Sequence, residues 1–71
     1  MATRAYIKGR NIFSVRVAAS EAGNGHWAWT VVDVFEGDEE VAIPGIESIV
    51  ADDEETAFRK AFEQIDKSVP A

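Results

Sequence analysis

Residues 26–35, HWAWTVVDVF, specify the principal strand of the fold. It is rich in Trp, Thr and Val, which suit the pleated, partly buried surface of a β-sheet better than they suit a helix. Turn-forming residues bound it on both sides, as expected for a strand. The sequence therefore predicts a strand over residues 26–35, the longest in the chain.

A second strand is predicted upstream, over residues 12–18, where apolar and polar residues alternate with the period of a strand that buries one face. The polar, glycine-rich loop at residues 23–25 would join these two strands. Residues 8–11 have the composition of a turn, and residues 6–7 can form a short additional strand. The apolar members of the second strand are Phe13, Val15 and Val17.

A third, short strand is predicted downstream of residues 26–35. Residues 36–39 contain Gly37 between acidic residues and have the composition of a turn. They lead into Val41-Ala42-Ile43, and Pro44 then removes an amide donor. Because proline is confined to edge strands and strand ends, residues 41–43 are expected to form a short piece of edge strand.

A C-terminal helix is predicted over residues 53–67. Asp52 or Asp53 can cap its first turn, Asp52 and Glu55 have the spacing of a capping box, and Pro70 prevents its continuation. One face of the helix is apolar, because small and aromatic residues recur at helical spacing. These residues are Ala57, Phe58, Ala61, Phe62 and Ile65.

These elements define an α+β fold in which a three-stranded antiparallel sheet is followed by one helix packed on one face. The chain has 71 residues, so residues 1–71 are expected to form a single small domain. A domain of this size buries only about 60% of the surface that its unfolded chain exposes, which leaves a thin margin of stability. A partner can therefore supply part of its core.

The long strand is apolar on both faces, but one helix covers only one of them. Trp27, Trp29 and Val31 share one face with Asp33, whereas Val32 and Val34 lie on the other. The charge of Asp33 favours an arrangement in which the valines meet the helix and the tryptophans lie on the open face. Trp27, Trp29 and Val31 then form a candidate interface, for which a symmetric homodimer is the simplest assembly. In the alternative arrangement the two tryptophans belong to the core.

The charge distribution is lopsided. The net charge is −6, and residues 21–55 contain eleven acidic side chains without a Lys or Arg. Such a balance disfavours nonspecific nucleic-acid binding, which depends on cations, and indicates an acidic surface for a basic protein partner or one that mimics DNA. The alternative is a nucleic-acid interface on the basic N-terminal strand, with Lys8, Arg10 and Arg16 as its contacts.

No motif in the sequence indicates catalysis or a cofactor. His26 is the only histidine and has no nucleophile motif beside it, and the chain contains no cysteine. The acidic clusters at residues 36–40 and 52–55 match no calcium-binding loop, and a turn and a helix start already explain them. We therefore predict a noncatalytic protein without a metal ion or cofactor.

The expected location is the cytoplasm. Small secreted domains usually depend on disulfides, which this chain cannot form. Residues 1–4 do not lead into an apolar segment of signal-peptide length, and no apolar run approaches the roughly 20 residues that span a bilayer. No membrane segment is expected.

Three motifs together resemble short bacterial proteins of unknown function with a β-β-β-α order. They are Tyr6-x-x-Gly9-x-x-Ile12, Gly25-x-Trp27-x-Trp29-x-Val31 and Ala57-Phe58-x-x-Ala61-Phe62-x-x-Ile65-Asp66-Lys67. The resemblance covers nearly the whole chain and implies the fold and a bacterial or phage source, without an activity. A looser similarity is to HicB-like antitoxins, which also begin with strands and a Tyr-x-x-Gly-like turn and bind a small basic toxin. Their appended DNA-binding segment has no counterpart here, so the similarity implies no repressor role.

Overall fold

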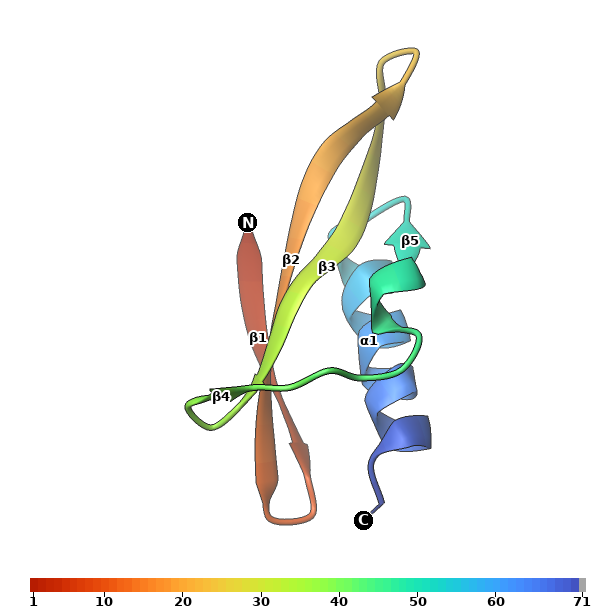
Figure 1. Cartoon of the computed structure of the whole chain (residues 1–71). Coiled ribbons are helices and arrows are strands. Elements are labelled where there is room, and N and C mark those ends of the chain that lie inside the picture. The colour runs from red at the N-terminus through yellow and green to blue at the C-terminus, as the bar shows by residue number, and fades with distance from the viewer. Residues whose placement is uncertain (71) are drawn as a thin grey trace.

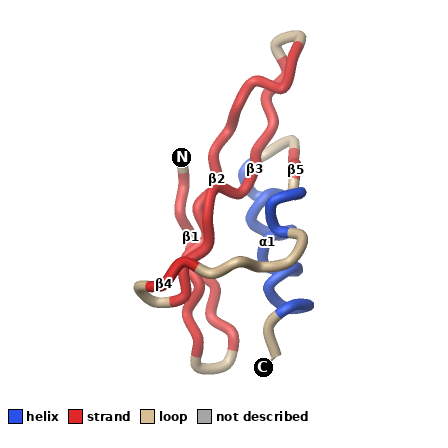
Figure 2. Tube along the Cα trace, viewed as in Figure 1, coloured by secondary structure: helices blue, strands red, loops and turns tan. Residues whose placement is uncertain are grey.

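The computed structural model describes residues 1–70 and shows an antiparallel sheet packed on one C-terminal helix (Figures 1 and 2). The strands follow one another in space in the order β1-β2-β3-β4, and β5 pairs with β3 further along the same sheet. The predicted α+β class and its C-terminal helix are confirmed. The bounds of the elements are β1 Ala2–Lys8, β2 Asn11–Gly23, β3 His26–Glu36, β4 Glu39–Glu40, η1 Ile46–Ser48, β5 Val50–Ala51 and α1 Glu54–Ser68.

Two two-residue turns connect the first three strands. Gly9 has a φ of 63° at the first central position of the β1–β2 turn, where glycine is favoured in hairpins. Asn24 and Gly25 have φ values of 53° and 74° in the β2–β3 turn, the left-handed pair for which Asn-Gly is the preferred sequence. The glycine-rich loop is therefore a tight hairpin turn.

The sequence underestimates the number and length of the strands. β1 spans Ala2–Lys8, whereas the sequence predicts only a short strand at residues 6–7. The prediction of a strand at residues 41–43 is wrong. The strand β4 lies at Glu39–Glu40, and the chain leaves the sheet before Pro44. β5 is a further two-residue strand that no periodic pattern can reveal.

The helix begins where its cap predicts. Asp53 is the N-cap residue, and its side chain accepts a hydrogen bond from the backbone N–H of Thr56 at 2.7 Å. This bond lowers the pKa of Asp53, since it stabilises the ionised carboxylate. Asp52 does not cap the helix, so the capping role belongs to the second of the two aspartates.

One core lies between the sheet and the helix. Phe13, Val15 and Val17 of β2 are at most 1% exposed and pack with the apolar face of α1. Alanines at positions 57 and 61 of the helix are fully buried, and their small side chains allow the helix to approach the sheet closely. The segment after β4 closes the side of this core with Ile43, Ile46 and Ile49.

The molecule is elongated, with principal dimensions of 42 × 21 × 18 Å. β1 begins at Ala2, opposite Val17, and β5 pairs with β3 only at Thr30 and Trp29, so β2 and β3 continue beyond Trp29 as a two-stranded ribbon to their turn. Figure 1 shows this ribbon extending past the helix, and every residue from Ser20 to Trp27 is exposed. The tip of the ribbon, residues 20–27, is therefore exposed to solvent.

Candidate interaction surfaces

The predicted tryptophan surface is divided between the core and solvent. Val31 is opposite the buried Val17, and both Val31 and Trp29 pack against the core on the helix side of the sheet. Trp27, two residues nearer the hairpin turn, is 57% exposed because the helix does not reach it. The open-face arrangement is therefore wrong, and Trp27 alone of the three candidate interface residues is largely exposed.

A β-bulge explains the error. Asp33 pairs with Arg16 and Val31 pairs with Val17, so Val32 is an extra residue on β3. The extra residue changes which side chains share a face, and Val34 joins Val31 on the helix side while Asp33 remains on the open side. Val32 itself is 47% exposed and does not meet the helix.

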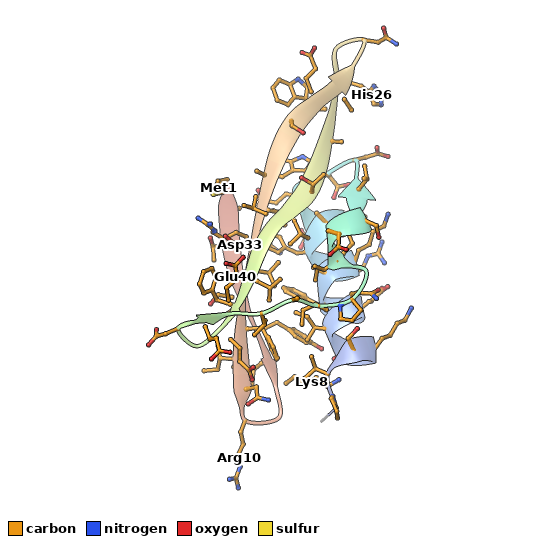
Figure 3. All side chains as sticks on the ribbon, in the orientation of Figure 1. Met1, Lys8, Arg10, His26, Asp33 and Glu40 are labelled. Carbon is orange, nitrogen blue, oxygen red and sulfur yellow. The ribbon has the colours of Figure 1, made fainter. Side chains whose placement is uncertain are left out.

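Two of the three candidate nucleic-acid contacts are engaged within the protein. Arg16 donates to both carboxylate oxygens of Asp33, with Nε 2.8 Å from Oδ1. Lys8 donates to the backbone oxygen of Asp66 at 2.7 Å and its side chain is only 14% exposed. Arg10 lies in the β1–β2 turn and points away from the rest of the molecule (Figure 3). These residues do not form a continuous basic surface.

The Arg16–Asp33 pair fixes the centre of the open sheet face. The Asp33 side chain is 10% exposed, and the hydrogen bonds from Arg16 lower its pKa despite partial burial, which acts in the opposite direction. The same bonds raise the pKa of Arg16, with a smaller contribution from the charge of Glu40. The Asp33 carboxylate is therefore paired with Arg16, whereas Glu40 forms no ion pair among residues 1–70.

The outer edge of β1 has no strand beside it in the described chain, since β1 pairs only with β2. A two-residue turn makes Lys8 and Asn11 a hydrogen-bonded pair, and such pairs alternate along an antiparallel ladder. The backbone N–H and C=O groups of Thr3, Ala5 and Ile7 are therefore directed to the free edge. Sequence reasoning missed this surface because it assigned only residues 6–7 to a strand.

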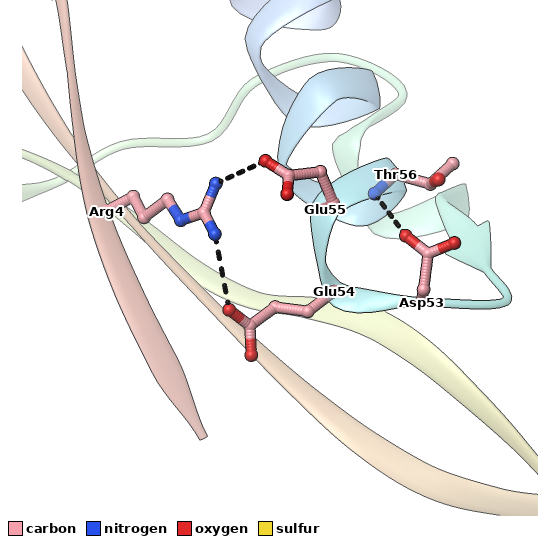
Figure 4. A network of polar contacts seen from close by, with 5 residues as sticks. All are labelled: Arg4, Asp53, Glu54, Glu55 and Thr56. Atoms are coloured by element: carbon pink, nitrogen blue, oxygen red, sulfur yellow. Dashed lines mark hydrogen bonds and ion pairs between the residues drawn. The ribbon is translucent and has the colours of Figure 1, made fainter.

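The cations of β1 do not protect this edge. Arg4 forms ion pairs with Glu54 at 3.5 Å and Glu55 at 3.1 Å, at the start of α1 (Figure 4). Its guanidinium also lies 4.6 Å from the centre of the Phe58 ring. Since Lys8 is likewise held by the helix, neither side chain extends over the free edge.

A hollow of about 350 Å³ lies between β1 and α1, beside the free edge, with Arg4, Phe58 and Phe62 in its lining. Tyr6 stacks on Phe62 with 4.6 Å between ring centres and donates a hydrogen bond to Asp66 at 2.6 Å. That hydrogen bond to the Asp66 carboxylate raises the pKa of Tyr6. The hollow therefore has aromatic walls and a polar rim.

The open sheet face has an apolar end next to the β1–β2 turn. Ile7 and Ile12 are directly opposite each other and are 68% and 53% exposed. Ala5 and Phe35 both lie opposite Ser14 on this face. The face is apolar at one end and charged at its centre.

A second hollow, of about 390 Å³, lies at the outer edge of β3. Its apolar lining includes Val32, Val34, Val41 and Ile46, and its polar lining includes Glu40 and Glu47. β4 pairs with β3 at Phe35–Glu36 and β5 pairs with it at Trp29–Thr30, so the hollow occupies the gap between these pairings. We refer to it below as the β3 groove.

The remaining chemical candidates are dispersed. His26 lies on the exposed hairpin, far from Asp33 and Glu40 (Figure 3). Within residues 1–70, no three His, Cys, Asp or Glu side chains gather in a way that could hold a metal ion. No helix in that part of the chain has the length and apolar character needed to cross a membrane.

Comparison with protein families, with curated proteins and with solved structures finds no match to this chain.

Proposed function

We propose that this protein is a noncatalytic protein-interaction module that self-associates through the outer edge of β1. The observation that carries the proposal is the free backbone edge of a seven-residue strand with neither of its cations extended over it. Unpaired edges of this kind are ready to pair with another strand, and natural monomers usually block them with Lys, Pro or a bulge. β1 contains no proline and no bulge.

A two-fold symmetric arrangement fits this edge. Antiparallel pairing of β1 with the β1 of a second copy would satisfy the outward backbone groups of both strands, and C2 is the commonest symmetry of homo-oligomers. The sheets would become continuous, with both helices on the same side. The second copy would also cover the hollow that Phe62 lines, which adds apolar burial to the backbone pairing.

The other function classes have weaker support. A nucleic-acid interface would have to use Lys8 and Arg16, but both side chains already bind acidic partners or backbone oxygens of this chain. An enzyme would need converging acid-base groups, whereas His26 stands apart on the hairpin. A bacterial source and a cytoplasmic location remain predictions from the sequence.

Substitution of Ala5 by Pro provides the test. Ala5 is exposed and its N–H is directed outward, so proline removes one donor from the free edge without removing a β1–β2 hydrogen bond. Ala5→Thr is the matched control, because threonine changes the same side chain and keeps the donor. Sedimentation equilibrium is expected to show dimers of the native chain and of Ala5→Thr, and a dissociation constant raised at least about tenfold for Ala5→Pro.

Two outcomes would contradict edge pairing. One is a native chain that stays monomeric at the highest concentration it tolerates. The other is an Ala5→Pro variant that remains folded and dimerises as well as Ala5→Thr. Ile12→Glu separates the edge from the open face: dissociation caused by Ile12→Glu but not by Ala5→Pro would assign the contact to the apolar end of that face. Val50→Glu is its control, since Val50 is similarly exposed at 57% and lies on β5.

A further inference from the structure

We infer that the β3 groove binds a short, extended, basic segment of another protein. The proposal goes beyond self-association, because the groove lies across the sheet from β1, on the far side of β2 and β3. The expected occupant places an aliphatic side chain in the groove and a Lys or Arg against each of Glu40 and Glu47.

The shape of the groove suits an extended segment. The β5 pairing ends at Thr30 and the β4 pairing begins at Phe35, so Val31, Val32 and Asp33 have no strand partner on that side. Backbone groups at such a gap can pair with an added strand, which is a recurring way of binding peptides. A volume of about 390 Å³ also lies within the range of small-ligand pockets and accommodates one or two side chains.

The bulge contributes to the apolar floor of the groove. Because Val32 is the extra residue of β3, its side chain is displaced from the regular alternation and stays 47% exposed. The partly buried Val41 also lines the groove, and the buried Val34 and Ile46 lie at its base. An aliphatic side chain placed there would remove Val32 from water, at a gain of about 25 cal/mol per Å² of apolar area.

The charges around the groove specify a basic occupant. Glu40 and Glu47 are exposed and form no ion pair within residues 1–70, whereas the third carboxylate of the groove, Asp33, is bound to Arg16. Residues 36–47 contain no Lys or Arg. A ligand with cations flanking an aliphatic residue would therefore match both the floor and the rim, while an acidic segment would be repelled.

Fluorescence anisotropy with labelled model peptides tests the proposal on the full chain. One probe alternates Lys and Val, a second replaces each Val by Ser, and a third replaces each Lys by Glu. The Lys-Val peptide is expected to bind, the Lys-Ser peptide to bind at least about tenfold more weakly for lack of apolar contact, and the Glu-Val peptide not to bind.

Charge-matched variants locate the site. Glu40→Gln combined with Glu47→Gln is expected to weaken binding of the Lys-Val peptide about 5- to 10-fold. Glu21→Gln combined with Asp52→Asn removes the same net charge from exposed residues outside the groove and is expected to leave the affinity unchanged. Equal weakening by both pairs would mean attraction to overall charge and would overturn the groove assignment.

The same titrations keep this proposal separate from self-association. Ala5→Pro is expected to bind the Lys-Val peptide like the native chain, since β1 lies away from the groove. A groove variant that dissociates the dimer would show that a second copy occupies the groove, contrary to the proposal. Absence of binding to the Lys-Val peptide by a folded native chain would also contradict it, and would leave the edge proposal unaffected.

Discussion

At the scale of single residues, Trp27 and Trp29 show how position along one strand gives two identical side chains different exposure to solvent. Both lie on the same side of β3, yet Trp29 packs against the core while Trp27 is 57% exposed beyond the end of the helix. Composition and alternation cannot distinguish them, because the difference depends on how far α1 reaches along the ribbon. The sequence predicts the strand but not this boundary.

The tryptophans give a matched pair of stability predictions. Trp29→Ala is expected to reduce the free energy of unfolding by about 3 kcal/mol, near the lower end for a buried aromatic because the ring is only partly buried. Trp27→Ala is expected to change it by no more than about 0.5 kcal/mol. Urea denaturation followed by far-UV circular dichroism measures both, and equal losses would contradict the placement of the two rings.

Asp33 makes stability depend on pH. Arg16 lowers the pKa of Asp33 in the folded protein, so the stabilisation is complete above the unfolded pKa, about 3.9, and is lost as the pH falls through the folded value. Asp33→Asn should therefore be less stable than the native chain at neutral pH, and the difference should shrink in strong acid. Urea titrations across this range, with Arg16→Gln as a second variant, check the prediction. A difference that stays constant with pH would contradict it.

At the scale of elements, helix α1 is the part that sequence predicts best. Its cap, its apolar face and its first turn are all local signals, and the observed bounds Glu54–Ser68 differ from the expected ones by a single residue at each end. Strand β1 is predicted poorly for a physical reason. Its helix-facing residues Arg4, Tyr6 and Lys8 are polar or amphipathic and bind α1 at their tips, so the strand lacks the apolar alternation that identifies β2.

The bulge in β3 likewise prevents the sequence from predicting which side chains share a face of the sheet. An extra residue reverses the alternation of every side chain on one side of it, and no residue type near Val32 marks the position. Alternation predicts the core residues of β2 correctly because β2 itself contains no extra residue between Asn11 and Val17. Strict alternation assigns the wrong faces on β3 because it takes no account of the bulge.

Deletion of Val32 tests the bulge directly. Without this surplus residue, Asp33 and Val31 can occupy consecutive positions opposite Arg16 and Val17, and both keep their present faces. The variant is expected to fold with a loss of about 1 kcal/mol. Deletion of Ser14, from a regular part of β2, would turn either Phe13 or Val15 out of the core and should cost more than about 3 kcal/mol. Similar losses for the two deletions, measured by urea denaturation, would be inconsistent with a bulge at Val32.

At the scale of the whole molecule, the layers follow from the sequence but the surfaces do not. One helix covers one face of a sheet that has two, which the pattern of residues 12–35 and 53–67 already indicates. The free edge of β1 and the β3 groove depend on strand lengths and on a two-residue strand, β5, that only the folded chain reveals. The candidate contacts of the folded chain are therefore backbone groups at one edge and carboxylates at the other, in place of the tryptophans.

Amide hydrogen exchange by NMR, followed residue by residue along β1 in dilute and concentrated solutions, shows whether the edge of β1 self-associates. The amides of Arg4, Tyr6 and Lys8 face β2 and should be protected in both. Those of Thr3, Ala5 and Ile7 should exchange rapidly in the dilute sample and become protected in the concentrated one. Outward amides that exchange equally fast at both concentrations would contradict self-association through the edge of β1.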